Sequence, residues 1–259
     1  MKFSFGKYIT LLLIISMLAA CGTSEGNTDA SSGDSEKDKK VLTMATSADF
    51  PPFESRDKDG NFQGFDIDLA HLIADKLGYE LKIEDMKFDG LIGALQSSRV
   101  DMVMAGMSTT EKRKKNVDFS TEYNHSGEMF ISQKDSGIKG LQDLKGKTVG
   151  VQLGTIQEEG AEKLSKEYGF NVKKVDNSSI LIQELKSNRV DVAYMDKTVA
   201  VGYIEEQGFS GFEDPTSSSP GMGIAFPKGS DLRDDVNKVL KELEKNGKLQ
   251  ELKDKWLSE

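Results

Sequence analysis

The order of apolar and polar positions predicts alternating strands and helices in the first half of the chain. Strands are expected at 41–46, 79–83 and 102–105, and helices at 65–77 and 91–97. The first helix carries its apolar side chains at intervals of three and four residues and is expected to end at Gly78. Asp89 is the expected N-cap of the second helix. This order is typical of a largely parallel sheet with helices on both faces.

The same order restarts in the second half. Strands are expected at 127–132, 148–152, 172–175, 190–195 and 223–226, and helices at 156–168, 180–186, 232–243 and 249–257. Residues 91–101 and 181–191 are identical at seven of eleven positions, which indicates two copies of one unit. We therefore expect two α/β lobes, with the final strand and helices returning to the first lobe. Two connections between the lobes would form a hinge.

The N-terminus has the pattern of a processing segment. Lys2 and Lys7 precede an apolar run at 8–18, which is too short for a comfortable membrane span, and small residues follow before Cys21. The sequence Leu-Ala-Ala-Cys resembles the lipobox of bacterial lipoproteins. That resemblance implies a lipid on Cys21 and attachment to the extracytoplasmic face of the cell membrane. The alternative is a plain secretory peptide with a leftover thiol.

The expected domains follow from these patterns. They are a signal peptide at 1–20, a flexible Gly/Ser/Asp-rich tether at 21–40, a first lobe at 41–127 plus 222–259, and a second lobe at 128–221. The net charge of the 259 residues is −9, and the first twenty residues carry two lysines and no acid, so the remainder carries −11. An acidic balance argues against a nucleic-acid partner.

The stretch 101–120 (DMVMAGMSTTEKRKKNVDFS) carries the most informative chemistry. A strand ends at Gly106, and Ser108 to Glu111 is expected to be a capping box that begins a helical turn carrying Arg113. A helix N-terminus with a guanidinium one turn later favours a carboxylate ligand. The alternative is a solvated arginine on a capped surface helix.

Asp196 follows the corresponding strand of the second half and has the opposite charge. Together with Arg113 it could hold a group with both a carboxylate and an ammonium, which is an α-amino acid. The alternative for Asp196 is the N-cap of a helix that begins near Lys197.

Several segments resemble one known family, the solute-binding proteins, family 3, of polar amino-acid ABC transporters. They are 45–54 (ATSADFPPFE), 64–69 (GFDIDL), 101–120, 144–155 (LKGKTVGVQLGT), 223–229 (GIAFPKG) and 246–257, and the resemblance covers 41–259. It implies a type II periplasmic-binding-protein fold of class α/β, with two lobes, each a mostly parallel sheet flanked by helices, and two hinge crossings. It also implies a monomer that binds a free L-amino acid and passes it to a membrane permease.

The resemblance places a ligand site on matching positions. Arg113 would take the ligand carboxylate with help from Ser108 and Thr155, and Asp196 would take the ammonium with acceptors near Gly106 and Ser108. Phe50 and Phe88 would flank the ligand side chain, although as residues alone they are equally typical of core aromatics. The full expected set is Ser47, Asp49, Phe50, Phe88, Ala105, Gly106, Ser108, Arg113, Gln152, Thr155 and Asp196.

The particular amino acid stays open. Ser47 stands where several relatives have Asp, and Ile156 where some have Thr, so a carboxylate for a cationic side chain is missing and Asp49 replaces it only in part. Arginine is the first expectation, with glutamine and cystine as alternatives.

An enzyme of the same fold, such as a dehydratase, would need a general acid, for which Glu54, Asp49 or Asp89 are candidates. No catalytic motif, metal cluster or cofactor is expected, because G-x-S-x-G is absent and the two histidines have no Cys or His cluster.

Overall fold

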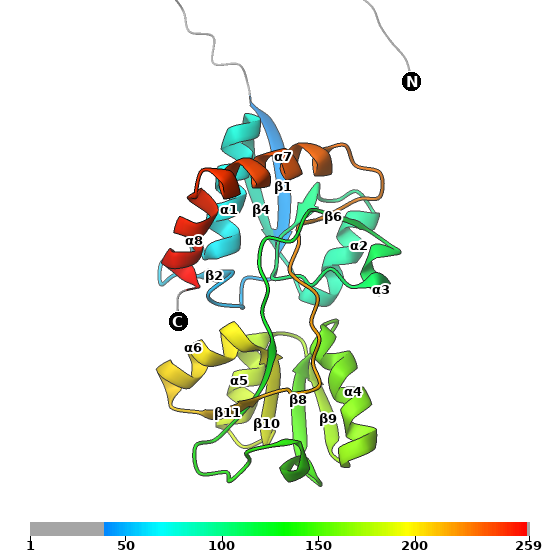
Figure 1. The fold of residues 1–259 in the computed structure, drawn as a ribbon, viewed down its shortest axis with the longest axis vertical. Helices are drawn as coiled ribbons and strands as arrows, with labels where there is room; N and C mark the ends of the chain where they lie inside the picture. Colours follow the sequence, from blue (N-terminus) through cyan, green and yellow to red (C-terminus); the bar gives the residue numbers. More distant parts are fainter. Residues whose placement is uncertain (1–38, 258–259) are drawn as a thin grey trace, which may run out of the picture. The chain divides into compact units, whose positions relative to one another are not determined.

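Two five-stranded sheets organise residues 39–257, the part of the chain that this computed structural model describes (Figure 1). We call each sheet with its helices a lobe. The sheet of the first lobe has the order β4 (Tyr79–Asp85), β1 (Lys40–Thr46), β5 (Met102–Val103), β12 (Ala225–Phe226), β6 (Asp118–Phe119). The sheet of the second lobe has the order β11 (Ser210–Glu213), β7 (Glu128–Ser132), β10 (Val192–Asp196), β8 (Thr148–Gln152), β9 (Asn171–Val175).

Helices cover both faces of each sheet. The first lobe carries α1 (Phe65–Leu77), α2 (Leu91–Gln96), α3 (Glu111–Lys114), α7 (Leu232–Lys245) and α8 (Lys248–Trp256), and the second carries α4 (Ile156–Tyr168), α5 (Ser178–Lys186) and α6 (Lys197–Gln207). Short elements complete the chain: β2 (Ser55–Arg56), β3 (Phe62–Gln63), and the 3-10 turns η1 (Phe88–Gly90) and η2 (Leu141–Leu144). None of the helices between residues 39 and 257 is both long and apolar enough to cross a membrane.

Four of the five strands in each sheet run in the same direction, which is the mostly parallel arrangement that was expected, but only four of the eight strand pairs in the two sheets are parallel. β1 pairs in parallel with β4 and β5, and β8 pairs in parallel with β9 and β10. The exceptions are β7 and β12, which run antiparallel to their neighbours. Each is the first strand after a crossing between lobes, so it enters its sheet from the end where the parallel strands finish. The fold is therefore the expected two-lobed α/β class, with one reversed strand in each sheet.

Two segments connect the lobes and run side by side between them (Figure 1). The backbone N–H of Met222 donates to the carbonyl of Asn124 at 2.8 Å, and the N–H of Tyr123 donates to the carbonyl of Met222 at 2.9 Å. The predicted pair of crossings is present.

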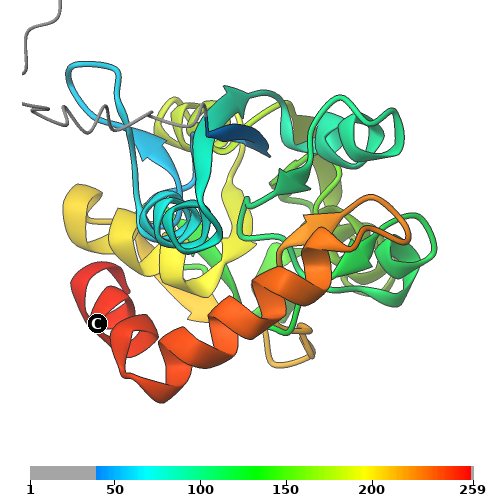
Figure 2. The ribbon, with the colours of Figure 1, turned by 90° about the horizontal axis from the view of Figure 1, so that it is seen from above.

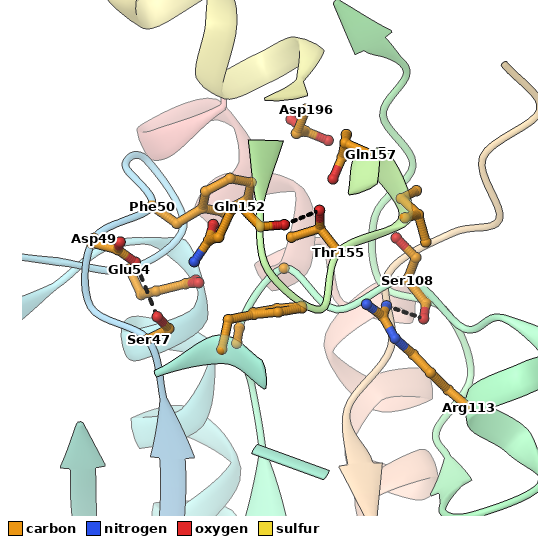
Figure 3. A pocket seen from close by; sticks show the side chains of 14 residues that line it. Ser47, Asp49, Phe50, Glu54, Ser108, Arg113, Gln152, Thr155, Gln157 and Asp196 are labelled. Carbon is orange, nitrogen blue, oxygen red and sulfur yellow. Dashed lines mark hydrogen bonds between the residues drawn. The ribbon is translucent and has the colours of Figure 1, made fainter. Parts of the chain in front are cut away.

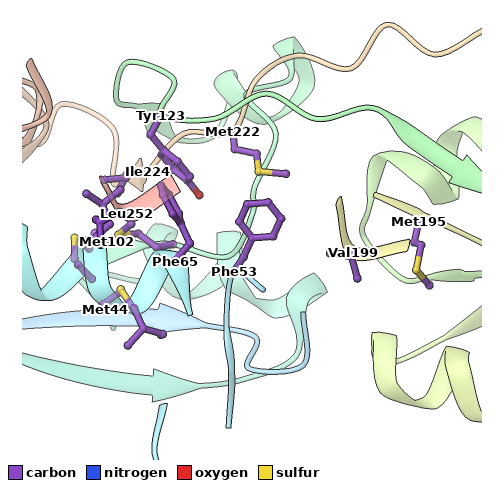
Figure 4. Close-up of a cluster of buried hydrophobic side chains, with 14 of the residues drawn as sticks. Met44, Phe53, Phe65, Met102, Tyr123, Met195, Val199, Met222, Ile224 and Leu252 are labelled. Carbon is purple, nitrogen blue, oxygen red and sulfur yellow. The ribbon is translucent and has the colours of Figure 1, made fainter. Parts of the chain in front are cut away.

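The core of the first lobe follows from the alternation of β1. Leu42 and Met44 face one side and belong to a buried cluster with residues of α1, α7 and α8, whereas Ala45 faces the other side and packs with residues of α2. Figure 2 shows α1, α7 and α8 along one side of this sheet, and Figure 4 shows Met44, Phe65 and Tyr123 within the larger cluster. The two-residue period of the strand thus fixes which helices cover which face.

The internal repeat is also a structural repeat. Ser98 and Asn188 occupy equivalent positions and have φ values of 53° and 55°, the two positive values for non-glycine residues within 39–257. Three residues later, Asp101 and Asp191 each accept a backbone N–H at 2.8 Å, from Thr43 and Thr148 respectively. Both copies therefore end a helix and enter a strand through the same left-handed turn.

Two local expectations were wrong. Asp89 does not cap α2, because it lies inside the preceding 3-10 turn, and no side chain caps that helix. The capping box at Ser108 is also wrong by two residues: Thr110 is the N-cap of α3 and accepts from the N–H of Arg113 at 3.2 Å. Since α3 is a single turn of four residues, its dipole is small, and its main effect is to position Arg113.

Several boundaries stay predictions. The strands of the first sheet fall at 40–119 and 225–226 and those of the second at 128–213, but the residues at which one lobe ends are not defined by the strands alone. The expected signal peptide, Cys21 and nearly all of the expected tether lie outside the described residues.

Candidate ligand-binding site

A cavity lies between the two lobes, at the carboxyl ends of the parallel strands (Figure 3). Fourteen residues line it, namely Ser47, Asp49, Phe50, Glu54, Phe88, Ala105, Gly106, Ser108, Arg113, Gln152, Thr155, Ile156, Gln157 and Asp196. All eleven residues expected from the sequence are therefore brought together around one cavity. Whether each contacts a ligand stays a prediction.

The lining side chains lie close together. The space open to the centre of a water molecule is about 30 Å³, and all unfilled space inside the lining, including the mouth, is about 400 Å³. The cavity is therefore narrow in this conformation.

Arg113 provides a buried positive charge. Its side chain is 7% exposed, and its guanidinium donates to the carbonyls of Ser108 at 2.9 Å and Gly154 at 3.0 Å. Burial lowers the pKa of Arg113 to about 10, and the charge of Glu159 acts in the opposite direction, so Arg113 is charged at neutral pH. Carbonyl groups carry no net charge, and a buried cation without a carboxylate favours an anionic ligand group.

The N-terminus of α4 faces the same side of the cavity. Its N-cap, Thr155, accepts from the N–H of Glu158 at 3.1 Å and donates to the carbonyl of Gln152 at 2.7 Å. The next two residues, Ile156 and Gln157, also line the cavity. Because α4 has thirteen residues, its positive dipole end adds to the attraction of Arg113 for a carboxylate.

Asp196 provides a buried negative charge from the second lobe. It is 5% exposed and caps α6, because one carboxylate oxygen accepts from the N–H groups of Thr198 at 2.8 Å and Val199 at 3.3 Å. The helix-cap interpretation of Asp196 is confirmed, and because the residue also lines the cavity, its role as the ammonium partner stays a prediction. Burial raises its pKa to about 6, although hydrogen bonds from Ser126 and from the α6 backbone act in the opposite direction.

Glu54 is the charged residue that the sequence argument left out of the ligand site. Its side chain is 0% exposed, and no donor group of the described residues reaches either carboxyl oxygen, although the carboxyl lies against that of Asp66. Burial, followed by the charges of Asp66 and Asp49, raises the pKa of Glu54 well above its usual value. The sequence feature that could have indicated Glu54 is the turn with two prolines between Phe50 and Glu54. In the structure a β-bridge joins the two ends of this turn, so that both residues lie beside the cavity.

Asp66 lies next to Glu54 and helps to hold the cavity wall in place. Its carboxylate accepts from the N–H of Gly106 and the hydroxyl of Tyr123, both at 2.9 Å. Burial raises the pKa of Asp66 to about 6. Gly106 needs its glycine, because φ is 53° and a Cβ there would lie 3.0 Å from the ring of Phe50.

Two aromatic rings border the cavity. The guanidinium carbon of Arg113 lies 5.3 Å from the ring centre of Phe88, and Phe50 stacks on Phe53 with ring centres 5.9 Å apart. Phe50 and Phe88 are only partly buried, which differs from a core aromatic and leaves ring surface available to a ligand.

Asp49 lines the cavity, but both of its carboxylate oxygens are already occupied. One accepts from the hydroxyl of Ser47 at 3.0 Å, and the other accepts from the backbone N–H of Ser178 at 2.6 Å. Ser178 begins α5 of the second lobe, so this bond joins the two lobes.

The described residues contain no group of three or more His, Cys, Asp or Glu side chains that could hold a metal ion. A buried cation on one lobe and a buried carboxylate on the other thus line the same cavity. This arrangement defines a two-lobed binding protein for a small zwitterion.

Comparison with known proteins gives the same class. Residues 42–259 match the model of the bacterial extracellular solute-binding proteins, family 3. The chain belongs to this family, which is one of binding proteins rather than enzymes.

Individual relatives agree with this assignment. The arginine-binding extracellular protein ArtP of Bacillus subtilis (strain 168) is 49% identical over 259 residues, covering 97% of this chain and 98% of the relative. The L-cystine-binding protein TcyJ of Escherichia coli (strain K12) is 33% identical over 224 residues, covering 85% of this chain and 84% of the relative. An ancestral arginine-binding protein bound to arginine has a structure that matches with a TM-score of 0.80 and 45% identity, covering 86% of this chain and 100% of the other.

Proposed function

We propose that this protein binds L-arginine outside the cytoplasm and delivers it to the permease of an ABC transporter. The observation that carries the ligand choice is the charge of the cavity. Besides Arg113 its lining holds no other basic side chain, whereas Asp49, Glu54 and Asp196 are acidic. Arg113 suits one ligand carboxylate, and Glu54 and Asp196 suit the two cationic groups of arginine. The name of the Bacillus subtilis relative supports the same ligand.

The α-amino acid end would lie between Arg113, the N-terminus of α4 and Asp196. Arg113 and the α4 N–H groups would hold the carboxylate, and Asp196 would hold the ammonium. Figure 3 places Arg113 on the side of the cavity opposite Glu54 and Asp49. A ligand whose head group sits at Arg113 would therefore extend its side chain toward Glu54.

Glu54 is proposed as the partner of the ligand guanidinium. A buried carboxyl without hydrogen-bond donors has a raised pKa because ionisation is costly, and a bound cation removes that cost. Phe50 would stack on the planar guanidinium from one side. Ser47, Ala105, Gly106, Ser108 and Gln152 would complete the wall of the site.

The test compares L-arginine with L-citrulline by calorimetry, because citrulline has nearly the same shape but no side-chain charge. Loss of one charge-assisted hydrogen bond to a buried carboxylate costs about 1.5–3 kcal/mol, so arginine should bind at least about tenfold more tightly. Glutamine and cystine, the alternative ligands, belong in the same titration series.

Glu54→Gln is the matched variant, since it keeps the shape and removes the charge. It should weaken arginine by about tenfold or more and leave citrulline nearly unchanged. Equal loss for both ligands, or tighter binding of cystine or glutamine than of arginine by the unchanged protein, would contradict the assignment.

Delivery would follow from hinge closure about the two crossings. In this proposal, residues 41–127 plus 222–259 move as one lobe and 128–221 as the other, and a permease accepts the closed, monomeric form.

We also infer that Cys21 carries a lipid and holds the protein at the extracytoplasmic face of the cell membrane, with 1–20 removed and 21–40 as the tether. The support is the pair of lysines at positions 2 and 7, the apolar run at 8–18 and the sequence Leu-Ala-Ala-Cys that ends at Cys21. Cys21→Ser should move the protein from the membrane fraction to the soluble fraction. Unchanged membrane association would contradict the anchor.

A further inference from the structure

A carboxylate of the first lobe accepts a hydrogen bond from the N-terminus of a helix of the second lobe. Asp49 follows β1 of the first lobe, and its carboxylate accepts from the N–H of Ser178, the first residue of α5, at 2.6 Å. The N-cap of that helix, Asn177, accepts from the N–H of Ile180 at 2.8 Å and leaves the N–H of Ser178 to Asp49. Two residues from different lobes thus share the N-terminus of α5.

The remaining oxygen of Asp49 is fixed by its own lobe. Ser47 donates its hydroxyl to that oxygen at 3.0 Å. Burial raises the pKa of Asp49, while the hydrogen bonds from Ser178, Ser47 and Ser179 act in the opposite direction; the nearby charge of Asp85 adds to the rise. The titratable groups near Asp49 also include Glu54 and Tyr203, neither of which offers it a positive charge. Its partners are therefore the hydroxyl and the helix N-terminus.

We propose that Asp49 is a closure latch that sets ligand affinity by holding the lobes together, without contacting the ligand side chain. The inference rests on the proposed function for its choice of ligands. Asp49 is then a positioning residue. It stabilises the closed form only while α5 is in contact with the turn that follows β1. A residue of this kind raises the fraction of the closed form, and apparent affinity rises in proportion for every ligand.

The other contacts across the lobes are less suited to this role. Lys87 pairs with Asp176 at 2.5 Å and Lys112 with Glu159 at 2.6 Å, but all four side chains are exposed and their attraction is screened by water and salt. Arg113 donates to the carbonyl of Gly154 at 3.0 Å, yet it is also the proposed carboxylate partner. Asp49 combines a partly buried position, a negative charge and a helix N-terminus.

The chain offers a way to remove the donor as well as the acceptor. Ser178 is the first residue of α5, a position where proline fits because that N–H has no partner within the helix. Asn177 has φ −150° and ψ 165°, an extended conformation that is compatible with a following proline. Ser178→Pro should remove the hydrogen bond and keep the helix, whereas Ser178→Ala keeps the N–H and serves as the matched control.

The first test measures affinity and dissociation rate for arginine and citrulline. Asp49→Ala and Ser178→Pro should each weaken both ligands by the same factor, about tenfold, mainly through faster dissociation. Asp49→Asn keeps an acceptor oxygen and should weaken both ligands less than Asp49→Ala does. Ser178→Ala keeps the backbone N–H and should weaken them far less than Ser178→Pro does. The double variant Asp49→Ala/Ser178→Pro should be no weaker than either single variant, because both remove one bond.

Two results would overturn the latch. A loss for arginine that greatly exceeds the loss for citrulline would make Asp49 a contact of the ligand side chain. Additive effects of Asp49→Ala and Ser178→Pro would mean that the two residues act separately.

A second readout needs no ligand. Fluorescent labels at the exposed positions Lys58→Cys and Lys166→Cys, with Cys21→Ser, report the separation of the lobes. Asp49→Ala should reduce the closed fraction of the ligand-free protein, and an unchanged distance distribution would contradict the latch. Failure of the proposed function would appear instead as absent arginine binding by the unchanged protein, while this distance measurement would still test Asp49.

Discussion

The two lobes contain the same helix–turn–strand unit, yet the end of that unit contributes a different residue to the cavity in each lobe. Both copies pass through a left-handed residue, Ser98 or Asn188, and fix the next strand with an aspartate. Five residues after that aspartate, the first lobe has Gly106 and the second has Asp196. Glycine lets the backbone turn and donate to Asp66, whereas aspartate places a carboxylate in the cavity. The repeat therefore determines the architecture, and single positions at its end determine the chemistry.

The charges are held in different ways. The negative charge of Asp196 is stabilised by hydrogen bonds from two N–H groups of α6, which belong to its own lobe. The guanidinium of Arg113 has only carbonyl groups as hydrogen-bond partners among the described residues, and one of them, on Gly154, belongs to the other lobe. Gly154 makes this approach possible, because a Cβ there would lie 2.9 Å from the Cα of Asp89. The charge of Arg113 thus depends for its stabilisation on contact with the other lobe and on a bound carboxylate, whereas the charge of Asp196 is stabilised within its own lobe.

The largest expected effect is that of Arg113→Ala. A ligand carboxylate would lose its main partner in a water-poor cavity, which costs about 3–5 kcal/mol, or more than a hundredfold in affinity. The ligand-free protein should keep or raise its melting temperature, because a buried charge without a carboxylate partner is removed. Calorimetry and thermal unfolding give the two values.

Arg113→Lys is the control for this change. It keeps the charge but loses the planar pair of donors, so its affinity should lie between those of the unchanged protein and Arg113→Ala. Near-normal arginine affinity in Arg113→Ala would show that the first lobe does not provide the carboxylate site.

Asp196→Asn tests the second lobe without disturbing its helix. Asparagine caps helices as well as aspartate does, so α6 and the melting temperature should be preserved. Loss of the charge on the ammonium partner should weaken arginine by about 1.5–3 kcal/mol, roughly 10- to 150-fold. If Asp196 is only a helix cap, this substitution will leave the calorimetric affinity unchanged.

The pH dependence separates binding from stability. Burial raises the pKa of Asp196 to about 6, so at pH 5 roughly one tenth of the ligand-free protein has it ionised. Arginine should therefore bind at least about tenfold more weakly at pH 5 than at pH 8, because protonation of Glu54, whose pKa is also raised, acts in the same direction.

Stability should change in the opposite direction. A folded-state pKa near 6 for Asp196 and Asp66, above the unfolded value of about 4, means that stability is lost as pH rises through 6 and regained as pH falls toward 4. Glu54, whose pKa is also raised, adds to this trend. Parallel loss of affinity and melting temperature on acidification would indicate acid unfolding instead.

The smallest effect concerns the repeat itself. Ser98→Gly should stabilise the ligand-free protein by about 0.5–1 kcal/mol, since glycine adopts positive φ without strain. Asn188→Gly should gain less, because asparagine tolerates this conformation better than serine. Chemical denaturation measures both, and a loss of stability in either variant would mean that the side chain at that turn has another role.

The sequence predicted the architecture well because long-range periodicity carries it. α1 and α4 occur at the expected residues, and the two crossings are present. The errors are in short elements. Hydrophobic periodicity cannot define a two-residue strand such as β6. The N-cap of the one-turn helix α3 is Thr110 rather than Ser108, because local backbone geometry decides which hydroxyl reaches the N–H of Arg113.

The cavity lining was predictable from strand ends and family resemblance, but not its internal contacts. Glu54 lies four residues from Phe50 in a proline-containing turn, whose geometry no periodic pattern reveals. Asp49 was expected in the ligand site and does line the cavity, but the hydrogen bonds of its carboxylate to Ser47 and Ser178 could not be predicted. Contacts between residues 129 positions apart depend on how the lobes meet, which the sequence does not state.

The central claim is that one zwitterion bridges Arg113 of the first lobe and Asp196 of the second. A crystal structure of the protein with L-arginine tests it most directly. We predict the ligand carboxylate within about 3 Å of the Arg113 guanidinium and the α-ammonium within about 3 Å of the Asp196 carboxylate. A ligand with both head-group charges held by one lobe, or an arginine bound outside this cavity, would contradict the account.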